Sequence, residues 1–286
     1  MTVKKALFNH PVQPLKPIPT GVLPDLANMQ HFSAMLFDVY GTLLISAAGE
    51  IGRHPWPAGR MDAIEELLKR YDMDPSAQPL LHTLVQRIEH WHGMLRNQGV
   101  DCPEVDIVQI WRQVLGMDDV SVVKAFAAEF EWVVNPVFPM PGFKELVSAC
   151  NSGGIRMGLI SNAQFYTIDT LERFLGASLE KKGFDQRLLF FSWREGHAKP
   201  SPVMFNRAKA ALSDMGIAAT RVLYVGNDLK NDILPAMAAG FKAALFAGDR
   251  RSLSPMVFDD RCSKQSPDLI VTDLRQLIAA TVNPQP

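Results

Sequence analysis

Asp38 is the side chain of this sequence best placed to do chemistry, because it follows an apolar, β-compatible run, Ala34–Phe37. Gly41 then permits a sharp turn, and Thr42 supplies a hydroxyl beside it. A carboxylate at the carboxyl end of a buried strand lies where open α/β sheets bind ligands, and it can attack a substrate as a nucleophile. The alternative is that Asp38 only caps the following turn, and this segment alone does not decide between the two.

Three later segments place further polar side chains at the end of an apolar run or just before a helix. The first run ends in a hydroxyl and an amide, a Pro-flanked loop carries a lysine, and a third run ends in a glycine and an acidic cluster. Each has a simpler explanation as a turn residue, a solvated cation or a helix N-cap. The candidates are Ser161 and Asn162, then Lys199, then Asn227, Asp228 and Asp232.

In this order and spacing the four segments resemble the motif set of the haloacid dehalogenase (HAD) hydrolase superfamily, from about Met35 to the end of the last helix. The resemblance implies that Asp38 attacks phosphorus or carbon and forms a covalent aspartyl intermediate. It also implies that Ser161 hydrogen-bonds the anionic group of the substrate and that Lys199 neutralises charge on the nucleophile and the substrate.

The resemblance further implies a Mg²⁺ ion, since a carboxylate that attacks a phosphate dianion needs a cation to offset the repulsion. If the pair Asn231-Asp232 sets the alignment, Asn227 takes the place of the first metal carboxylate and Asp228 lies one position beyond it. The expected ligands are oxygen atoms of Asp38, Tyr40 (through its main-chain carbonyl), Asn227, Asp228 and Asp232.

Tyr40 departs from the phosphatases of the superfamily, which typically carry a second Asp two residues after the nucleophile. A tyrosine, with an ordinary pKa of about 10, is a poor base at neutral pH. The pattern Asp-Val-Tyr-Gly-Thr-Leu at 38–43 is similar instead to the 2-haloacid dehalogenases, in which halide leaves without a proton and no metal is needed.

The acids at 228 and 232 favour a Mg²⁺-assisted phosphatase of a small phosphorylated metabolite, and we expect this function from the sequence. A metal-independent 2-haloacid dehalogenase is the alternative, and a catalytically weak fold that only binds a ligand or partner is the second. We expect Thr42, Asn162 and Arg53 to contact the substrate. A guanidinium grips carboxylate or phosphate at two points, although a plain surface arginine is the alternative for Arg53.

The hydrophobic pattern predicts an α/β fold, a doubly wound parallel-sheet (Rossmann-like) core with an inserted all-helical cap domain. We expect a Pro-rich arm at 1–33, the core at 34–44 and 139–286, and the cap at 45–138, with about four helices and no strand between Leu44 and Pro136. Strands are expected at 34–37, 155–160, 188–191, 222–226 and 243–246, and core helices near 142–150, 165–175, 202–214, 231–239 and 273–281.

Composition narrows the class of partner. The 286 residues carry a net charge of −1, which does not indicate binding to nucleic acid or to an anionic membrane surface. We therefore expect a small anionic substrate. Three widely spaced cysteines indicate neither a disulfide scaffold nor a zinc site, and they fit a reducing cytoplasm. No stretch has the length of a signal peptide or membrane span, and the oligomeric state stays open.

Overall fold

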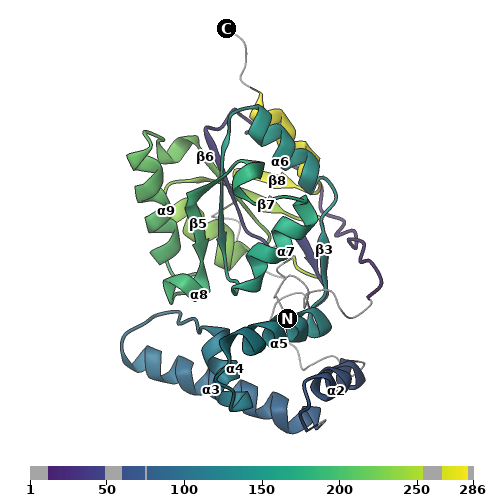
Figure 1. The fold of residues 1–286 in the computed structure, drawn as a ribbon. Helices are drawn as coiled ribbons and strands as arrows, with labels where there is room; N and C mark the ends of the chain where they lie inside the picture. Colours follow the sequence, from purple (N-terminus) through teal and green to yellow (C-terminus); the bar gives the residue numbers. More distant parts are fainter. Residues whose placement is uncertain (1–11, 49–59, 75, 254–265, 283–286) are drawn as a thin grey trace.

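A computed structural model describes residues 12–48, 60–74, 76–253 and 266–282. Its centre is a parallel sheet of six strands in the order β5-β4-β1-β6-β7-β8 (Figure 1). The first strand in the sequence is therefore central, and Asp38 leaves it in the middle of the sheet's carboxyl edge. The strands are β1 (Ala34–Phe37), β4 (Arg156–Ser161), β5 (Phe184–Phe191), β6 (Val222–Gly226), β7 (Lys242–Phe246) and β8 (Leu269–Val271).

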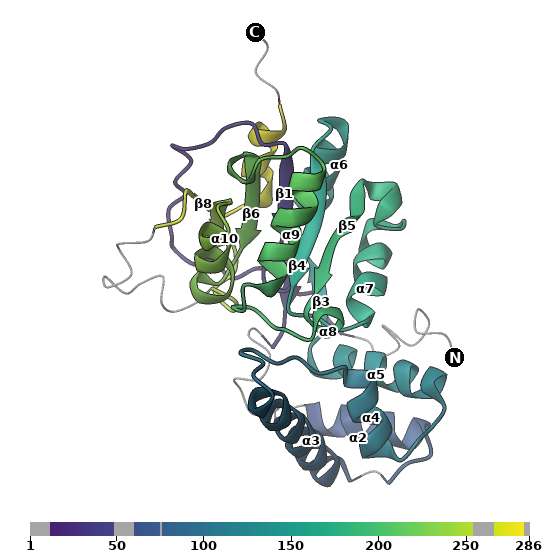
Figure 2. The same cartoon turned by 90° about the vertical axis from the view of Figure 1, so that its left-hand side faces the viewer.

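Alternate side chains of these strands enter two separate apolar clusters, one on each face of the sheet, because strand side chains have a period of two. Leu36 and Tyr224 belong to the cluster that α9 and α10 cover, whereas Met35 and Phe37 belong to the cluster of α6, α7 and η7. Figure 2 shows the two helical layers on either side of the sheet. These helices are α6 (Phe143–Ser152), α7 (Tyr166–Leu175), α9 (Val203–Asp214), α10 (Leu234–Ala238) and the 3₁₀ helix η7 (Leu274–Thr281).

The doubly wound parallel sheet predicted from the sequence is confirmed, with differences in three elements. β8 was not predicted, since three residues are too short to show a strand period. β5 begins at Phe184, ahead of the expected 188, because its first half is partly exposed and polar. The helix expected from 231 begins with a π-helical turn, η4 (Leu229–Ile233), before α10.

In the described part of the chain, four helices between β2 (Leu44–Ser46) and β3 (Val137–Pro139) form a layer of their own, which we call the helical cap, and in Figure 1 they lie below the sheet with α5 nearest to it. Their buried side chains make a separate apolar cluster, in which the rings of Trp111 and Phe126 meet edge to face at 4.9 Å. The proposed division into core and cap remains a proposal, which this cluster supports. The helices are α2 (Met61–Arg70), α3 (Ala77–Asn97), α4 (Ile107–Leu115) and α5 (Val120–Val134).

The chain passes between core and cap through two short antiparallel strands, β2 (Leu44–Ser46) and β3 (Val137–Pro139). The expectation of no strand between Leu44 and Pro136 was therefore wrong at β2, whose three residues give no readable alternation. The two linkers are therefore held to each other where the chain crosses between core and cap.

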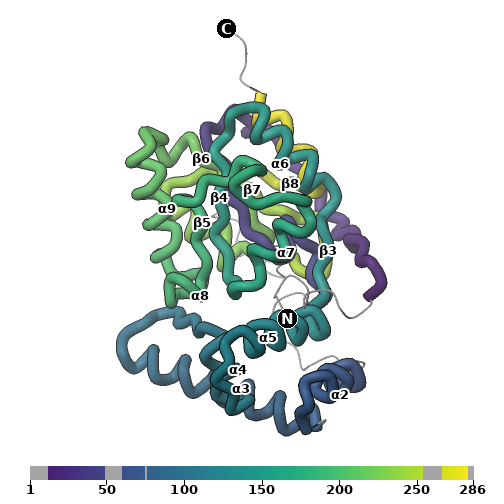
Figure 3. The backbone as a smooth tube through the Cα atoms, in the orientation of Figure 1, coloured from purple at the N-terminus to yellow at the C-terminus, as the bar shows by residue number. Residues whose placement is uncertain are grey.

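The described part of the Pro-rich arm lies against the core, and Figure 3 shows it running along the outside of the domain. Ile18 N donates to Asp249 Oδ1 at 3.0 Å, and Thr20 Oγ1 donates to the carbonyl of Ala247 at 2.8 Å. Asp25 exchanges main-chain hydrogen bonds with Ile270 of β8. Arm residues therefore cover the edge of the sheet, and residues 1–11 lie outside the described part.

Two further observations concern the expectations from composition. Cys102 and Cys150 are free thiols. Within the described ranges, no helix has both the length and the apolar character needed to cross a membrane.

Candidate active site

The turn after β1 holds Asp38 in place by main-chain hydrogen bonds. Asp38 N donates to the carbonyl of Val225 on β6 at 2.9 Å, and Gly41 N donates to the carbonyl of Leu44 at 2.7 Å. Gly41 has a φ of 86°, and a Cβ there would lie 2.5 Å from Ser252 Cβ, so only glycine fits this position. The sharp turn predicted at Gly41 is confirmed.

The two carboxylate oxygens of Asp38 have different surroundings. Oδ1 accepts from Lys199 Nζ at 2.6 Å and from Ser161 Oγ at 2.9 Å. Oδ2 has a single long contact among the described residues, with Thr42 Oγ1 at 3.5 Å. Its lone pairs are therefore free to attack a substrate, while the bonds to Oδ1 fix the direction of the carboxylate.

Lys199 joins two carboxylates. Its ammonium group lies 2.6 Å from Asp38 Oδ1 and 2.6 Å from Asp232 Oδ1. It also donates to the Tyr224 hydroxyl at 3.2 Å, and this hydroxyl lies 2.9 Å from Asp232 Oδ1. Lys199, Asp38 and Asp232 are all buried, so the ammonium is held firmly between the two carboxylates. One positive and two negative groups give the cluster a formal charge of −1.

Burial raises the pKa of Asp38 to about 6, against the lowering effect of Lys199 and with a further raising effect of Asp232. Burial alone would lower the pKa of Lys199, but the negative charges of Asp232 and Asp38 outweigh it and raise that pKa. At neutral pH Asp38 is therefore ionised and Lys199 is charged, which is the state that a carboxylate nucleophile requires.

The side-chain amide of Asn162 binds the main chain of Lys199 through both its oxygen and its nitrogen atom. Asn162 Oδ1 accepts from Lys199 N at 2.6 Å, and Asn162 Nδ2 donates to the carbonyl of Lys199 at 3.2 Å. We expected Asn162 to contact the substrate. These bonds show that Asn162 positions the main chain of Lys199, and its contact with the substrate stays a prediction.

Asn227 and Thr42 line the other side of Asp38. Thr42 Oγ1 donates to Asn227 Oδ1 at 3.1 Å, and Asn227 Nδ2 donates to the carbonyl of Ser252 at 2.6 Å. Asn227 is buried beside Asp38. These contacts support Asn227, rather than Asp228, as the residue at the first metal-ligand position of the motif.

Asp228 and Asp232, the two acids that follow Asn227 in the sequence, bind other groups of the protein. Asp228 Oδ1 accepts from the main-chain N–H groups of Lys230 and Asn231 at 2.7 and 2.8 Å, so Asp228 is the N-cap of η4. Asp232 Oδ1 binds Lys199, and its Oδ2 accepts from Asp228 N at 2.9 Å. A Cβ on Gly226 would lie 2.4 Å from Asp232 Cγ, so the glycine gives this carboxylate its room.

The fit of Mg²⁺ depends on the oxygens left beside Asp38. Asp38 Oδ2 and Asn227 Oδ1 both lie near Thr42 Oγ1, so these two oxygens are on the same side of the site. Together with the main-chain carbonyl of Tyr40, a ligand expected from the sequence, they would give a set of hard oxygen donors, which suits Mg²⁺ in type but contains one carboxylate. Within the described ranges, no three His, Cys, Asp or Glu residues lie close enough together to hold a metal ion.

Tyr40 shares a hydrogen bond of 2.8 Å with Thr167 Oγ1 on α7. Burial, and after it the charge of Glu131, raise the pKa of Tyr40 far above its ordinary value. Tyr40 therefore stays protonated and cannot serve as a base. Arg53, the remaining residue expected to contact the substrate, lies outside the described residues.

Several polar residues around the site were not predicted from the sequence. Tyr224 lies in an apolar strand, where a lone hydroxyl among buried side chains was the available signal. Glu131 lies on α5, where it accepts from the Tyr166 hydroxyl at 3.0 Å. Glu104 and Gln164 meet across the junction of cap and core at 3.3 Å, and a single sequence carries no signal for such a long-range pair.

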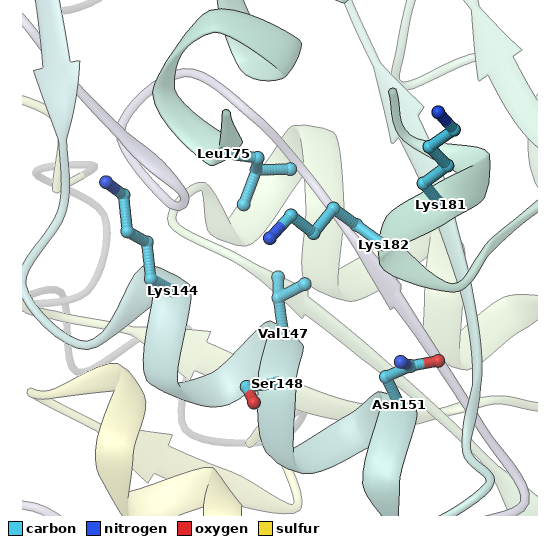
Figure 4. A pocket seen from close by; sticks show the side chains of 7 residues that line it. All are labelled: Lys144, Val147, Ser148, Asn151, Leu175, Lys181 and Lys182. Carbon is cyan, nitrogen blue, oxygen red and sulfur yellow. The ribbon is translucent and has the colours of Figure 1, made fainter. Parts of the chain in front are cut away.

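A cavity of about 180 Å³ lies elsewhere on the core, between α6, the end of α7 and the 3₁₀ helix η2 (Glu180–Lys182). In Figure 4 the amino group of Lys182 lies between Val147 and Leu175, while Lys144 and Lys181 stand at the sides. Because η2 directly precedes β5, it belongs to the amino end of the strands, opposite Asp38. This cavity is not part of the candidate active site.

With this geometry established, comparison with known proteins identifies the family. The profile described as "Hydrolase: haloacid dehalogenase-like hydrolase" matches residues 32–240. This range is more than half of the chain, so the protein belongs to the haloacid dehalogenase-like hydrolases, as the four motifs indicated. None of the curated proteins matches the chain.

Solved structures share this fold at low sequence identity. A 2-haloacid dehalogenase from Pseudomonas syringae pv. Tomato DC3000 is 19% identical with a TM-score of 0.53, and the match covers 86% of this chain and 96% of that chain. An L-2-haloacid dehalogenase from Xanthobacter autotrophicus is 16% identical (TM-score 0.49; 86% and 97% covered). A HAD phosphatase from Thermococcus onnurineus is 15% identical (TM-score 0.46; 86% and 95% covered). At 19% identity, the similarity to the Pseudomonas syringae protein shows the fold alone.

Proposed function

We propose that this hydrolase acts on a small anionic substrate through a covalent ester on Asp38, and that release of halide from a 2-haloacid is the reaction that its site supports best. The observation that carries the proposal is the unequal environment of the Asp38 carboxylate. Oδ1 is held by Lys199 and Ser161, while Oδ2 is left with one contact of 3.5 Å.

The proposed reaction has two steps. Asp38 Oδ2 attacks the carbon that carries the halogen, a C–O bond forms, the C–X bond breaks, and halide leaves with the bonding electron pair. Water then attacks the ester, which releases the 2-hydroxy acid, restores the Asp38 carboxylate and yields a proton to the solvent. The charge of Lys199 attracts the anionic substrate and reduces the repulsion between it and Asp38.

Three observations support halide as the leaving group. Tyr40 stays protonated and is bound to Thr167, so it supplies no base. Halide needs no proton donor, and the absence of a second Asp therefore does not hinder its release. Asp228, on which the expectation of a magnesium site partly rested, caps η4 instead.

A Mg²⁺-assisted phosphatase is the second candidate, and it is the function expected from the sequence. It is favoured by the common orientation of Asp38 Oδ2 and Asn227 Oδ1 toward the Thr42 hydroxyl. Asp38, Asn227 and the carbonyl of Tyr40 would hold the ion, which when bound would offset the charge of a phosphoryl group. The protein would then act on a small phosphorylated metabolite.

A paired activity screen separates these functions. The purified protein is assayed with 2-chloropropionate for halide release and with p-nitrophenyl phosphate for phosphate release, each with added Mg²⁺ and with EDTA. Asp38→Asn serves as the inactive control. Halide release that EDTA does not change supports the first proposal, and Mg²⁺-dependent phosphate release supports the second. Broader panels of 2-haloacids and phosphate esters follow the two probes, and no activity in either panel would refute both and favour a ligand-binding role.

A further inference from the structure

A segment of the helical cap, residues 98–106 between α3 and α4, contacts the core directly beside Lys199; in Figure 1 it lies below α8 (Ser192–Glu195). Two main-chain hydrogen bonds join the segments. Glu104 N donates to the carbonyl of Gly196 at 3.1 Å, and Ala198 N donates to the carbonyl of Cys102 at 2.7 Å. The cap therefore pairs with the loop that ends at Lys199.

The carboxylate of Glu104 reaches further into the core. Its Oε2 accepts from Ser192 Oγ at 2.7 Å, and its Oε1 accepts from Gln164 Nε2 at 3.3 Å and from Val105 N at 2.9 Å. The amide of Gln164 also donates to the carbonyl of Val105 at 2.9 Å. Glu104 thus binds two core segments, the turn after β4 and the start of α8.

These two segments carry the groups that hold Asp38. The Ser192 hydroxyl that binds Glu104 also accepts from Ala163 N at 3.0 Å, two residues beyond Ser161. The segment after α8 leads to Lys199, and Asn162 binds its main chain. Hydrogen bonds from Glu104 through Ser192 to Ala163, the covalent chain from Ala163 to Asn162, and the bonds of Asn162 therefore connect the cap to the end of β4 and to the main chain of Lys199.

We propose that Glu104 is a positioning residue which couples closure of the cap to assembly of the active site. With Glu104 seated on Ser192 and Gln164, the turn after β4 and the loop before Lys199 are fixed together, so that Ser161 Oγ and Lys199 Nζ meet on Oδ1 of Asp38. When the cap moves away, both segments lose these bonds and the two donors are no longer held to one position. The consequence for turnover rests on the proposed function of Asp38.

Two variants of Glu104 separate positioning from charge. Glu104→Ala removes the acceptor of Ser192 and should lower kcat about ten- to a hundredfold, because small displacements of catalytic groups have effects of this size. Glu104→Gln should retain most of kcat, since an amide oxygen still accepts and the Ser192 hydroxyl can donate instead to the carbonyl of Ala163, at 3.3 Å. Glu89→Ala, an exposed acid on α3, is the matched control.

Amide hydrogen exchange supplies a readout that does not need turnover. In Glu104→Ala, the amides of Ala163 and Ala198 should exchange faster than in the wild-type protein, while those of β1 and β6 should not change. Glu104→Gln and Glu89→Ala should exchange like the wild type. If no substrate is turned over by any of the four proteins, the proposed function fails, and the exchange pattern still tests Glu104.

The proposal is overturned if Glu104→Ala keeps the wild-type kcat and the wild-type exchange at Ala163 and Ala198. It is also overturned if exchange rises equally throughout the sheet, because Glu104 would then contribute only to general stability. Equal losses of kcat in Glu104→Gln and Glu104→Ala would contradict it as well. Such a result would mean that Glu104 acts through its negative charge and not by holding the two core segments in position.

Discussion

Replacing Lys199 by methionine should move the pH dependence of the reaction to higher pH. Methionine keeps the approximate length of the side chain but removes the charge that lies 2.6 Å from Asp38 Oδ1. Lys199 lowers the pKa of Asp38, while burial and Asp232 raise it. Without the lysine, only the hydrogen bond from Ser161 still opposes the raising effects of burial and Asp232, so the carboxylate of Asp38 should take up a proton more readily.

The size of the change follows from the pKa of Asp38, which is about 6. At neutral pH about nine-tenths of Asp38 is then ionised. A nearby opposite charge lowers a carboxyl pKa by about 1–3 units, so the variant should show a pKa of about 7–9. The ionised share at neutral pH falls to between about one-half and one-hundredth, which lowers kcat/KM about two- to hundredfold through ionisation alone.

The assay is the pH profile of kcat/KM, which reports ionisation in the free enzyme. Only the ionised form of Asp38 attacks, so activity should rise as pH increases through its pKa, near pH 6 in the wild type and at higher pH in Lys199→Met. Lys209→Met, on the exposed side of α9, should keep the wild-type profile. An unshifted acid limb in Lys199→Met, with the fold intact by circular dichroism, would show that Lys199 does not control the ionisation of Asp38.

Four further variants, at three positions, test the remaining assignments. Asp38→Asn should abolish turnover. Folding raises the pKa of Asp38 from 3.8 to about 6, so the wild-type protein loses up to about 3 kcal/mol of stability as pH rises through that interval, and the variant does not. Thermal melts should therefore show the stability of the variant increasing relative to wild type with rising pH, and an increase toward low pH would contradict this reasoning. Tyr40→Phe should keep most of kcat, whereas loss of a general acid or base would lower kcat by about 10²–10⁴-fold; Tyr40→Asp should raise only phosphatase activity. Asn227→Asp should make activity respond to Mg²⁺ and EDTA, and no response would exclude Asn227 from the metal position.

Much of the core could be predicted because its strands are short buried runs that end in recognisable turns. The order of β1, β4 and β6 in the sheet follows from the doubly wound pattern, and it brings Asp38, Ser161 and the acids after Gly226 to one edge. Three-residue strands such as β2 and β8 carry too little pattern to be recognised.

The partners of individual side chains could not be predicted in the same way. Asp228 and Asp232 look equivalent in the sequence, yet the π-helical turn directs Asp232 to Lys199 and leaves Asp228 as an N-cap. Asn162 likewise reads as a free amide until the loop of Lys199 folds against it. Such assignments depend on a fraction of a helical turn, which residue spacing alone does not determine.

The central claim is that Asp38 forms an ester with the substrate, and a labelling experiment tests it most directly. In water labelled with heavy oxygen, one sample of the protein turns over less than one equivalent of 2-chloropropionate, so that the product of the first turnover can be analysed. A second sample turns over an excess, and the peptide that contains Asp38 is then analysed by mass spectrometry. Water that attacks the acyl carbon of the ester leaves its oxygen in the carboxylate, so we expect heavy oxygen in Asp38 and unlabelled product from the first turnover. Product labelled in the first turnover, with Asp38 unlabelled, would mean that water attacks the substrate directly and would contradict the claim.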